Sequence, residues 1–313
     1  MYAPTKATLY QNFHSTFGAD LRSKKLSGSA VLQWVRTDRK ARTCEPADLY
    51  RVAQELSRHT YPKLPTRYWF YSLRFACGLR PVQLTARYEQ WLGQQPQFAP
   101  LFGSPFSILP TVRFDLSRTA RTVRYAGRPD QLADFNHEIA ELLQQSDAII
   151  GYGGYGEVRD FYRWESYGDF PEDGLTRRVR DMHLGTDFWT TAGTPVFAPL
   201  DGTVYARIPA GPFRGYGPSV VLFHRPFPGF HFYTSYGHLS AASVERLRSG
   251  QRIRAGRLIG KLGTPDENGG WPAHLHFQVH VDMLGSKELL GVGYSTERPL
   301  WMDLCPNGEE LLR

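Results

Sequence analysis

Residues 272–281 read Pro-Ala-His-Leu-His-Phe-Gln-Val-His-Val. Apolar and polar residues alternate in this run, and it contains β-branched and aromatic residues, so it predicts a strand. Side chains two positions apart share one face of a strand, which places His274 and His276 side by side. Such a pair suits a site in which one imidazole holds a metal while its neighbour acts as an acid or base. The alternative, from this stretch alone, is a pair of partly exposed strand histidines.

The size and composition of the chain are those of a soluble globular protein. It has 313 residues, 41% hydrophobic and 21% charged, enough for one large or two ordinary domains. Residues 1–150 hold 20 lysines and arginines against 12 acidic residues, whereas residues 151–313 hold 17 against 18. A basic N-terminal half suits a polyanion such as nucleic acid, an anionic membrane or an acidic wall polymer. Its arginines are dispersed, however, so an ordinary solvated surface explains them equally well, and we expect no nucleic-acid partner.

The sequence shows no transmembrane segment and no targeting segment. No stretch approaches the ~20 apolar residues of a spanning helix, and residues 1–6 lack the apolar core of a signal peptide. We therefore expect a cytoplasmic protein, or a periplasmic or extracellular one if a leader is missing or export is unconventional. Cys44, Cys77 and Cys305 form no C-x-x-C pair and are odd in number, which predicts buried free thiols.

The N-terminal third is predicted to be helical. Helices are expected over residues 45–59, 65–78 and 81–92, each with a proline near its start, and residues 30–35 suit either a strand or a helix. The aromatic residues of the second helix are expected in a core rather than as a platform for stacking bases. Glycine and proline concentrate between residues 93 and 105. We therefore predict a helical accessory domain over 1–95, a linker over 96–105 and a β-rich domain over 106–313 with its core at 180–282.

A glycine-rich stretch precedes the β-rich core. After a short strand at 108–114 and an amphipathic helix at 129–145, residues 151–156 read Gly-Tyr-Gly-Gly-Tyr-Gly. This matches G-x-G-x-x-G, the dinucleotide fingerprint. No βαβ repeat surrounds it, so we interpret it as a loop in which glycines allow tight turns.

From residue 181 onward the sequence predicts short strands separated by turns. Three hairpins are expected: 194–199 with 203–206, 219–223 with 230–234, and 252–254 with 258–262. Many short strands with regular turns and few helices predict an antiparallel β-sandwich or barrel. Together with the helical N-terminal part, the expected fold class is α+β.

Seven of the ten histidines lie between residues 183 and 280, and His183 stands four residues before Asp187. On a regular strand those two side chains would lie roughly 13 Å apart. They meet on one ion only if Gly185 bends the strand. His183, Asp187 and one member of the His274/His276 pair would then leave an open fourth position, the pattern of catalytic zinc. That position holds a water which the metal makes nucleophilic near neutral pH.

His238 ends a predicted strand within Tyr236-Gly237-His238-Leu239-Ser240. If it faces the same cleft, it can hydrogen-bond the reacting carbonyl or the oxyanion, while His274 moves a proton from the water to the leaving amine. The alternative for His238 is an edge histidine satisfied by backbone. His224 and His231 are interpreted as turn or surface residues, and His280 has no partner in the sequence.

In this order the motifs resemble the lysostaphin-type zinc metallopeptidases, many of which cut cross-links or stem peptides of bacterial peptidoglycan. The resemblance covers roughly residues 180–280 and rests on residues 183–187, 195–204, 236–240, 250–256 and 274–277. It implies one zinc ion per chain on His183, Asp187 and His276, with His238 and His274 as catalytic histidines, in an antiparallel two-sheet domain with a groove. The chain departs from the family at residues 264–273, which are not the usual Ser/Thr/Gly-rich loop, and at Gln278, where the family often has glutamate.

The expected function is therefore that of a zinc-dependent endopeptidase, with peptidoglycan stem peptides or cross-bridges as the expected substrate. The alternative is a module of the same fold that only binds wall fragments or a partner. Residues 198–204 also resemble a lipoyl or biotinyl carrier, but no lysine stands at a hairpin tip there. The sequence leaves open whether residues 147–170 or 264–273 cover the groove.

Overall fold

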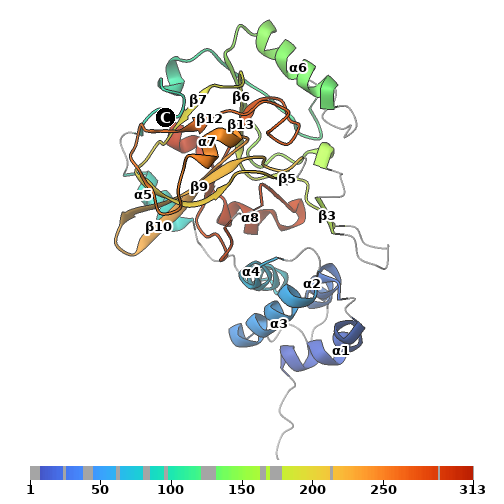
Figure 1. Cartoon of the computed structure of the whole chain (residues 1–313). Coiled ribbons are helices and arrows are strands. Elements are labelled where there is room, and N and C mark those ends of the chain that lie inside the picture. Colours follow the sequence, from blue (N-terminus) through green and yellow to red (C-terminus); the bar gives the residue numbers. More distant parts are fainter. Residues whose placement is uncertain are drawn as a thin grey trace, which may run out of the picture.

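The computed structural model of the chain combines helices with mostly antiparallel sheets, as the sequence predicts (Figure 1). It describes residues 8–23, 26–37, 45–60, 64–79, 85–94, 98–120, 132–162, 167–169, 178–211, 214–287 and 290–312. None of the helices in these ranges combines the length and the apolar character that crossing a bilayer requires.

Four helices form a group at the N-terminal end of the chain, drawn in blue in Figure 1: α1 (Leu9–Ser23), α2 (Gly28–Thr37), α3 (Pro46–His59) and α4 (Thr66–Ala76). The helices predicted to begin near residues 45 and 65 are confirmed, and residues 30–35 are helical. Tyr68 and Trp69 of α4 are buried, so these aromatic side chains belong to a core, as expected. The Tyr68 hydroxyl also donates to Glu297 at 3.0 Å, and its ring lies 5.5 Å from that of Trp301.

The next helix, α5 (Ala86–Leu92), packs on the β-rich part instead. The rings of Trp91 and Tyr88 lie 4.9 and 5.1 Å from the ring of Phe232. Farther along, Phe102 lies 5.5 Å from Phe188, ring to ring. These segments therefore cover the sheet with apolar side chains. The boundaries proposed at residues 95 and 105 stay predictions, and the predicted start of this helix at 81 lies outside the described residues.

The largest sheet of the described residues has eight strands in the order β1-β2-β6-β13-β10-β9-β8-β11. The pairing of β1 with β2 is parallel and all other neighbours are antiparallel. The strands are β1 (Thr111–Arg113), β2 (Ile150–Gly153), β6 (Thr186–Trp189), β13 (His274–His280), β10 (Phe230–Gly237), β9 (Ser219–Phe227), β8 (Gly202–Ile208) and β11 (Arg252–Ile253).

Three two-stranded sheets accompany the large one: β7 (Pro195–Phe197) with β12 (Leu258–Lys261), β5 (Met182–His183) with β14 (Val292–Gly293), and β3 (Gly168–Asp169) with β4 (Arg178–Val179). The other elements are α6 (Leu132–Gln145), α7 (Ala241–Glu245), α8 (Arg298–Leu304), η2 (Phe106–Ile108), η3 (Asp160–Tyr162), η5 (Ser295–Glu297) and η6 (Gly308–Leu312).

Of the three expected hairpins, only β9 with β10 is confirmed. The other two are wrong, because β7 pairs with β12 while β8 pairs with β9 and β11. The Asp201 carboxylate accepts a hydrogen bond from the backbone N–H of Ala255 at 2.8 Å, and Gly202 lies against the His224 imidazole. Asp201 and Gly202 therefore connect β7, in the sheet with β12, to β8 in the eight-stranded sheet, and they do not form the turn of a hairpin.

Strand β13 is buried along its whole length. Leu275, Phe277 and Val279 belong to the apolar core on one side of the sheet, and the alternating polar residues face the other side. The predicted strand is confirmed. The alternative of partly exposed histidines is wrong, since His274 and His276 are only 6% and 3% exposed.

The prediction that the cysteines are buried free thiols is only partly confirmed. Cys305 is a buried free thiol, and burial raises its pKa to about 12. Cys77, in contrast, is disulfide-bonded, so the prediction of a free thiol is wrong there. Cys44 lies outside the described residues.

His224 is a buried structural residue, contrary to its interpretation as a turn or surface residue. It lies on β9, is 1% exposed, and contacts the Asp201 carbonyl at 2.8 Å and the Thr234 hydroxyl at 2.7 Å. Burial lowers the pKa of His224 to about 4. His231, on β10, is exposed as expected.

This burial makes stability depend on pH. Between about pH 6.5 and pH 4 the unfolded chain binds a proton at residue 224 that the folded chain does not. The contribution of neutral His224 to the free energy of unfolding is therefore fully present above about pH 6.5 and is lost as the pH drops to about 4. The loss from this residue amounts to about 3 kcal/mol at most. We expect His224→Gln to flatten the fall in unfolding free energy, measured by urea denaturation from pH 7 to pH 4. His231→Gln is the control, and equal slopes for both variants would contradict the assignment.

Candidate metal centre and active site

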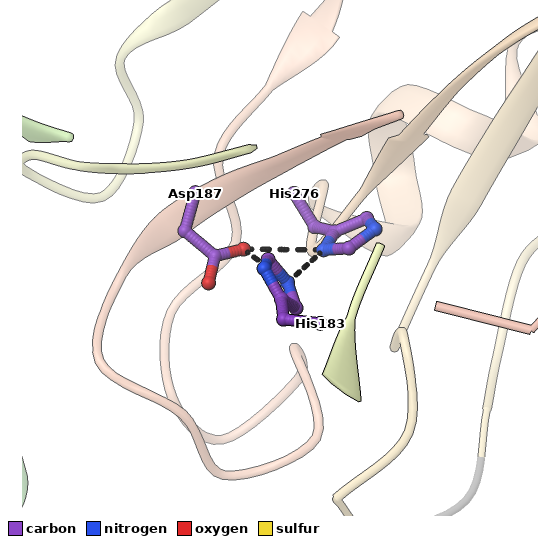
Figure 2. Close-up of side chains that lie close together, drawn as sticks. All are labelled: His183, Asp187 and His276. Atoms are coloured by element: carbon purple, nitrogen blue, oxygen red, sulfur yellow. Dashed lines mark hydrogen bonds and ion pairs between the residues drawn. The ribbon is translucent and has the colours of Figure 1, made fainter. Parts of the chain in front are cut away.

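Three side chains from three strands converge on one point (Figure 2). His183 Nε2 lies 2.9 Å from His276 Nδ1, and Asp187 Oδ1 lies 3.2 and 3.1 Å from these two nitrogens. Among the described residues they form a group able to hold a metal ion, and all three are buried. Of the two histidines between which the spacing leaves the choice open, His276 is the one in this group.

A bend at Gly185 brings His183 and Asp187 together. The chain leaves β5 after His183, bends at Gly185 and enters β6 at Thr186, as the H-x-x-x-D spacing requires. A Cβ atom at residue 185 would lie 2.7 Å from the His276 ring and from the Phe277 carbonyl oxygen. Asp187 and His276 are direct neighbours in the β6–β13 register, which places their side chains on the same face.

The hydrogen-bond partners of the two imidazoles determine which ring nitrogen carries the hydrogen. His183 Nδ1 lies 3.0 Å from the Gly154 carbonyl, which can only accept, so this nitrogen carries the hydrogen. His276 Nε2 lies 2.8 Å from Gln278 Oε1, and the amide of Gln278 is oriented by donating to the Leu290 carbonyl. Both imidazoles therefore point a lone pair at the common centre.

The donor set fits a divalent metal such as zinc. Two imidazole lone pairs and a carboxylate oxygen meet at 2.9–3.2 Å with no hydrogen between the nitrogens, which is unfavourable unless a cation lies among them. Tetrahedral zinc with bonds of about 2.0–2.1 Å separates its ligand atoms by about 3.3 Å. The observed separations lie close to that value.

The charges of the site suit metal binding at neutral pH. Burial alone would raise the pKa of Asp187, but the Arg159 guanidinium outweighs it and holds this pKa well below its usual range. Burial and the Arg159 charge lower the pKa of His183 to about 3. The aspartate is therefore charged and the imidazole is neutral, which are the forms that bind metal.

His238 and His274 lie beside this group as a pair. Their rings are 4.1 Å apart, and His274 Nε2 lies 3.8 Å from Asp187 Oδ1. Each donates from Nδ1 to a backbone carbonyl, His238 to Asn268 at 2.8 Å and His274 to Pro272 at 2.7 Å. Burial lowers the pKa of both, so each is neutral and presents Nε2 as a proton acceptor. His238 has φ of 62°, a strained conformation of the kind found at functional sites.

A cavity of about 280 Å³ opens onto the five residues predicted for the site. Its walls combine apolar and aromatic side chains with arginines and include Phe135, Arg180, Trp189, Arg214, Trp271 and Val292. Tyr162 and Tyr167 of segment 147–170 also line the cavity, as does Trp271 of segment 264–273. Both segments that were considered as covers of the groove therefore contribute to its wall.

Sequence reasoning missed four residues that surround the predicted ligands. Gly154 accepts from His183, Arg159 pairs with Asp187 at 2.8 Å, and Tyr216 and Gln278 lie behind His276. The signal for Gly154 was the glycine-rich stretch at 151–156. Its interpretation as a loop is only partly right, since residues 151–153 belong to β2 and the turn follows at 155–156, beside the metal centre. Gln278 stood out as a departure from the resembled family. Nothing in the local sequence marks Arg159 or Tyr216.

The strands that carry the metal-binding group lie within a region that matches a known family of lysostaphin-type proteins. Residues 181–287 match the family model described as Peptidase family M23, and they form the M23 domain of this chain.

Relatives share this domain rather than their whole length. An uncharacterized metalloprotease of Haemophilus influenzae is 38% identical over 109 residues, 34% of this chain and 20% of that protein. The peptidoglycan DD-endopeptidase ShyA of Vibrio cholerae is 32% identical over 153 residues, 46% of this chain and 33% of that protein. Among solved structures, the catalytic domain of lysostaphin from Staphylococcus simulans is 24% identical with a TM-score of 0.31, covering 51% of this chain and 96% of that one.

The bend at Gly185 can be tested by adding one methyl group. In Gly185→Ala the new Cβ meets the His276 ring at 2.7 Å and displaces the donor atoms, so we expect zinc affinity to fall at least about tenfold. Affinity is measured by competition with a chromophoric chelator, and folding by circular dichroism. Gly93→Ala, whose Cβ would have no neighbour closer than 3.6 Å, is the control. A folded Gly185→Ala protein with wild-type affinity would refute this account.

Proposed function

We propose that the protein is a zinc-dependent endopeptidase that hydrolyses peptide bonds of peptidoglycan stem peptides or cross-bridges. The observation that carries this proposal is the convergence of His183, Asp187 and His276 beside two further imidazoles in one cavity. The family match and the activities of two relatives support it: ShyA is a peptidoglycan DD-endopeptidase, and Mpg of Neisseria meningitidis is a DD-carboxypeptidase/endopeptidase.

In the proposed mechanism, His183, Asp187 and His276 would hold one zinc ion, which would supply Lewis acidity and lower the pKa of water at its open position. His274 and His238 move protons. Since each presents an unprotonated Nε2, either can first accept a proton from the attacking water. The imidazolium so formed is then a donor to the oxyanion or to the leaving amine. His238 can therefore stabilise an oxyanion only after it has taken a proton.

The alternative is a module that binds wall fragments without cutting them. It is disfavoured because the donor set and both neighbouring imidazoles are present together. We further propose that the protein works outside the cytoplasm, where peptidoglycan lies. The disulfide at Cys77 supports an oxidising compartment.

The arrangement of domains is also part of the proposal. We propose that residues 1–95 act as an accessory helical domain and that the β-rich part has the two-sheet architecture of lysostaphin-type peptidases. The packing of α1 to α4 on one another and the pairing of β7 with β12 beside the large sheet support these assignments.

Digestion of purified sacculi tests the activity directly. We expect the protein to release peptide fragments whose masses identify the bond that is cut. Dialysis against a chelator should abolish release and added zinc should restore it, because the nucleophile depends on the metal. His276→Ala should lose both zinc and turnover, while His231→Ala, which changes an exposed histidine of the same sheet, should keep both. Unchanged turnover in His276→Ala, or zinc binding without cleavage of any murein or peptide, would reject the endopeptidase.

The neighbouring histidines should separate chemistry from metal binding. In His274→Gln and His238→Gln we expect zinc to stay bound within a few-fold of wild-type affinity, while turnover falls about 10²- to 10⁴-fold through loss of proton transfer. Zinc content is measured by elemental analysis and turnover by fragment release. Full turnover in either variant would remove that histidine from the mechanism.

A further inference from the structure

A segment outside the family domain packs directly on the metal-binding residues. β2 pairs with β6 so that Gly153 is the neighbour of Asp187, although residues 150–162 precede the matched residues 181–287. The same segment brackets His183: the Gly156 N–H donates to the His183 carbonyl at 2.9 Å, and the His183 N–H donates to the Glu157 carbonyl at 2.8 Å. Both ligands at the His183–Asp187 bend are therefore held by this segment.

Arg159 occupies the carboxylate oxygen of Asp187 that faces away from the imidazoles. Its NH1 lies 2.8 Å from Asp187 Oδ2, and its Nε lies 2.9 Å from Glu157 Oε2. The guanidinium is only 2% exposed, so these charge-assisted contacts are protected from water. With Oδ2 held in this way, Oδ1 is the oxygen presented to His183 and His276.

Gly154 lets Arg159 and His183 approach each other. Its φ is 102°, and a Cβ there would lie 2.1 Å from the Arg159 guanidinium and 2.9 Å from His183 Nδ1. Tyr162 completes the arrangement, because its hydroxyl lies 3.1 Å from Arg159 NH1 and its ring stacks over that of His183. One short segment thus contacts the non-ligating side of two of the three ligands.

We propose that Arg159 is a positioning residue of the metal centre, and that residues 153–162 are a part of that centre which the family domain alone does not supply. Arg159 fixes which oxygen of Asp187 points at the metal, and the Gly154 carbonyl fixes which nitrogen of His183 does. Mutation of a residue that hydrogen-bonds a metal ligand typically lowers metal affinity about 10- to 100-fold. This inference rests on the proposed function of the site.

Zinc binding by variants of the full chain tests the proposal. We expect Arg159→Met to weaken zinc affinity about 10- to 100-fold, measured by competition with a chromophoric chelator. Arg159→Lys, which keeps the charge but loses the planar fork, should fall between Arg159→Met and the wild type. The visible spectrum of the Co²⁺-loaded protein should change in Arg159→Met, since the carboxylate is free to turn. That spectrum would not report a role in folding alone.

The matched control is Arg118→Met. Arg118 forms ion pairs with Asp160 of the same segment at 2.7 Å and with Asp181 at 3.4 Å, and neither partner is a predicted ligand, so its variant should lose much less zinc affinity than Arg159→Met and keep the spectrum. If Arg159→Met fails to fold, the double variant Glu157→Gln/Arg159→Met is measured instead. It also removes the charge of Glu157, which pairs with Arg159 in the wild type. Wild-type affinity and spectrum in the folded variant would overturn the proposal, as would an equal loss in Arg118→Met. A wild-type chain that binds no zinc would instead reject the proposed function itself.

Discussion

The structure depends on three electron-rich atoms being held at one buried point. Left alone, two imidazole lone pairs and a carboxylate oxygen at 2.9–3.2 Å repel one another. Each of the three side chains is oriented by a second contact on its other side: a carbonyl at His183, an amide oxygen at His276 and a guanidinium at Asp187. These outer partners decide which atom of each side chain is offered, and a cation turns the repulsion into binding energy.

The sheet gives this point its precision. Asp187 and His276 are opposite neighbours on β6 and β13, which have further strands on both outer sides. His183 joins them from β5 through the bend at Gly185. β13 is buried along its whole length, and most residues that line the cavity beside its histidines come from loops and short elements around the sheet.

Much of this could be predicted from the sequence where local rules apply. The alternation at 272–281 gave the strand, the apolar spacing gave α3 and α4, and the need for a bend at Gly185 follows from strand geometry. The pairing partners of β7, β8 and β12 could not be predicted, because turn residues alone do not say which strands pair when the chain crosses between sheets. Arg159, Gln278 and Tyr216 act through contacts between residues far apart in sequence, so their place behind the ligands appears only once the sheet is formed. The catalytic and metal-binding roles of the five site residues stay predictions.

The antiparallel pairing of β2 with β6 bears on where the domain begins. β6 carries Asp187, and β2 satisfies the hydrogen-bonding groups along its outer side. A fragment that begins at residue 181 would leave that side open to water and to other chains, as an unprotected sheet edge prone to self-association. The sheet that carries Asp187 therefore includes a strand upstream of the residues that match the family model.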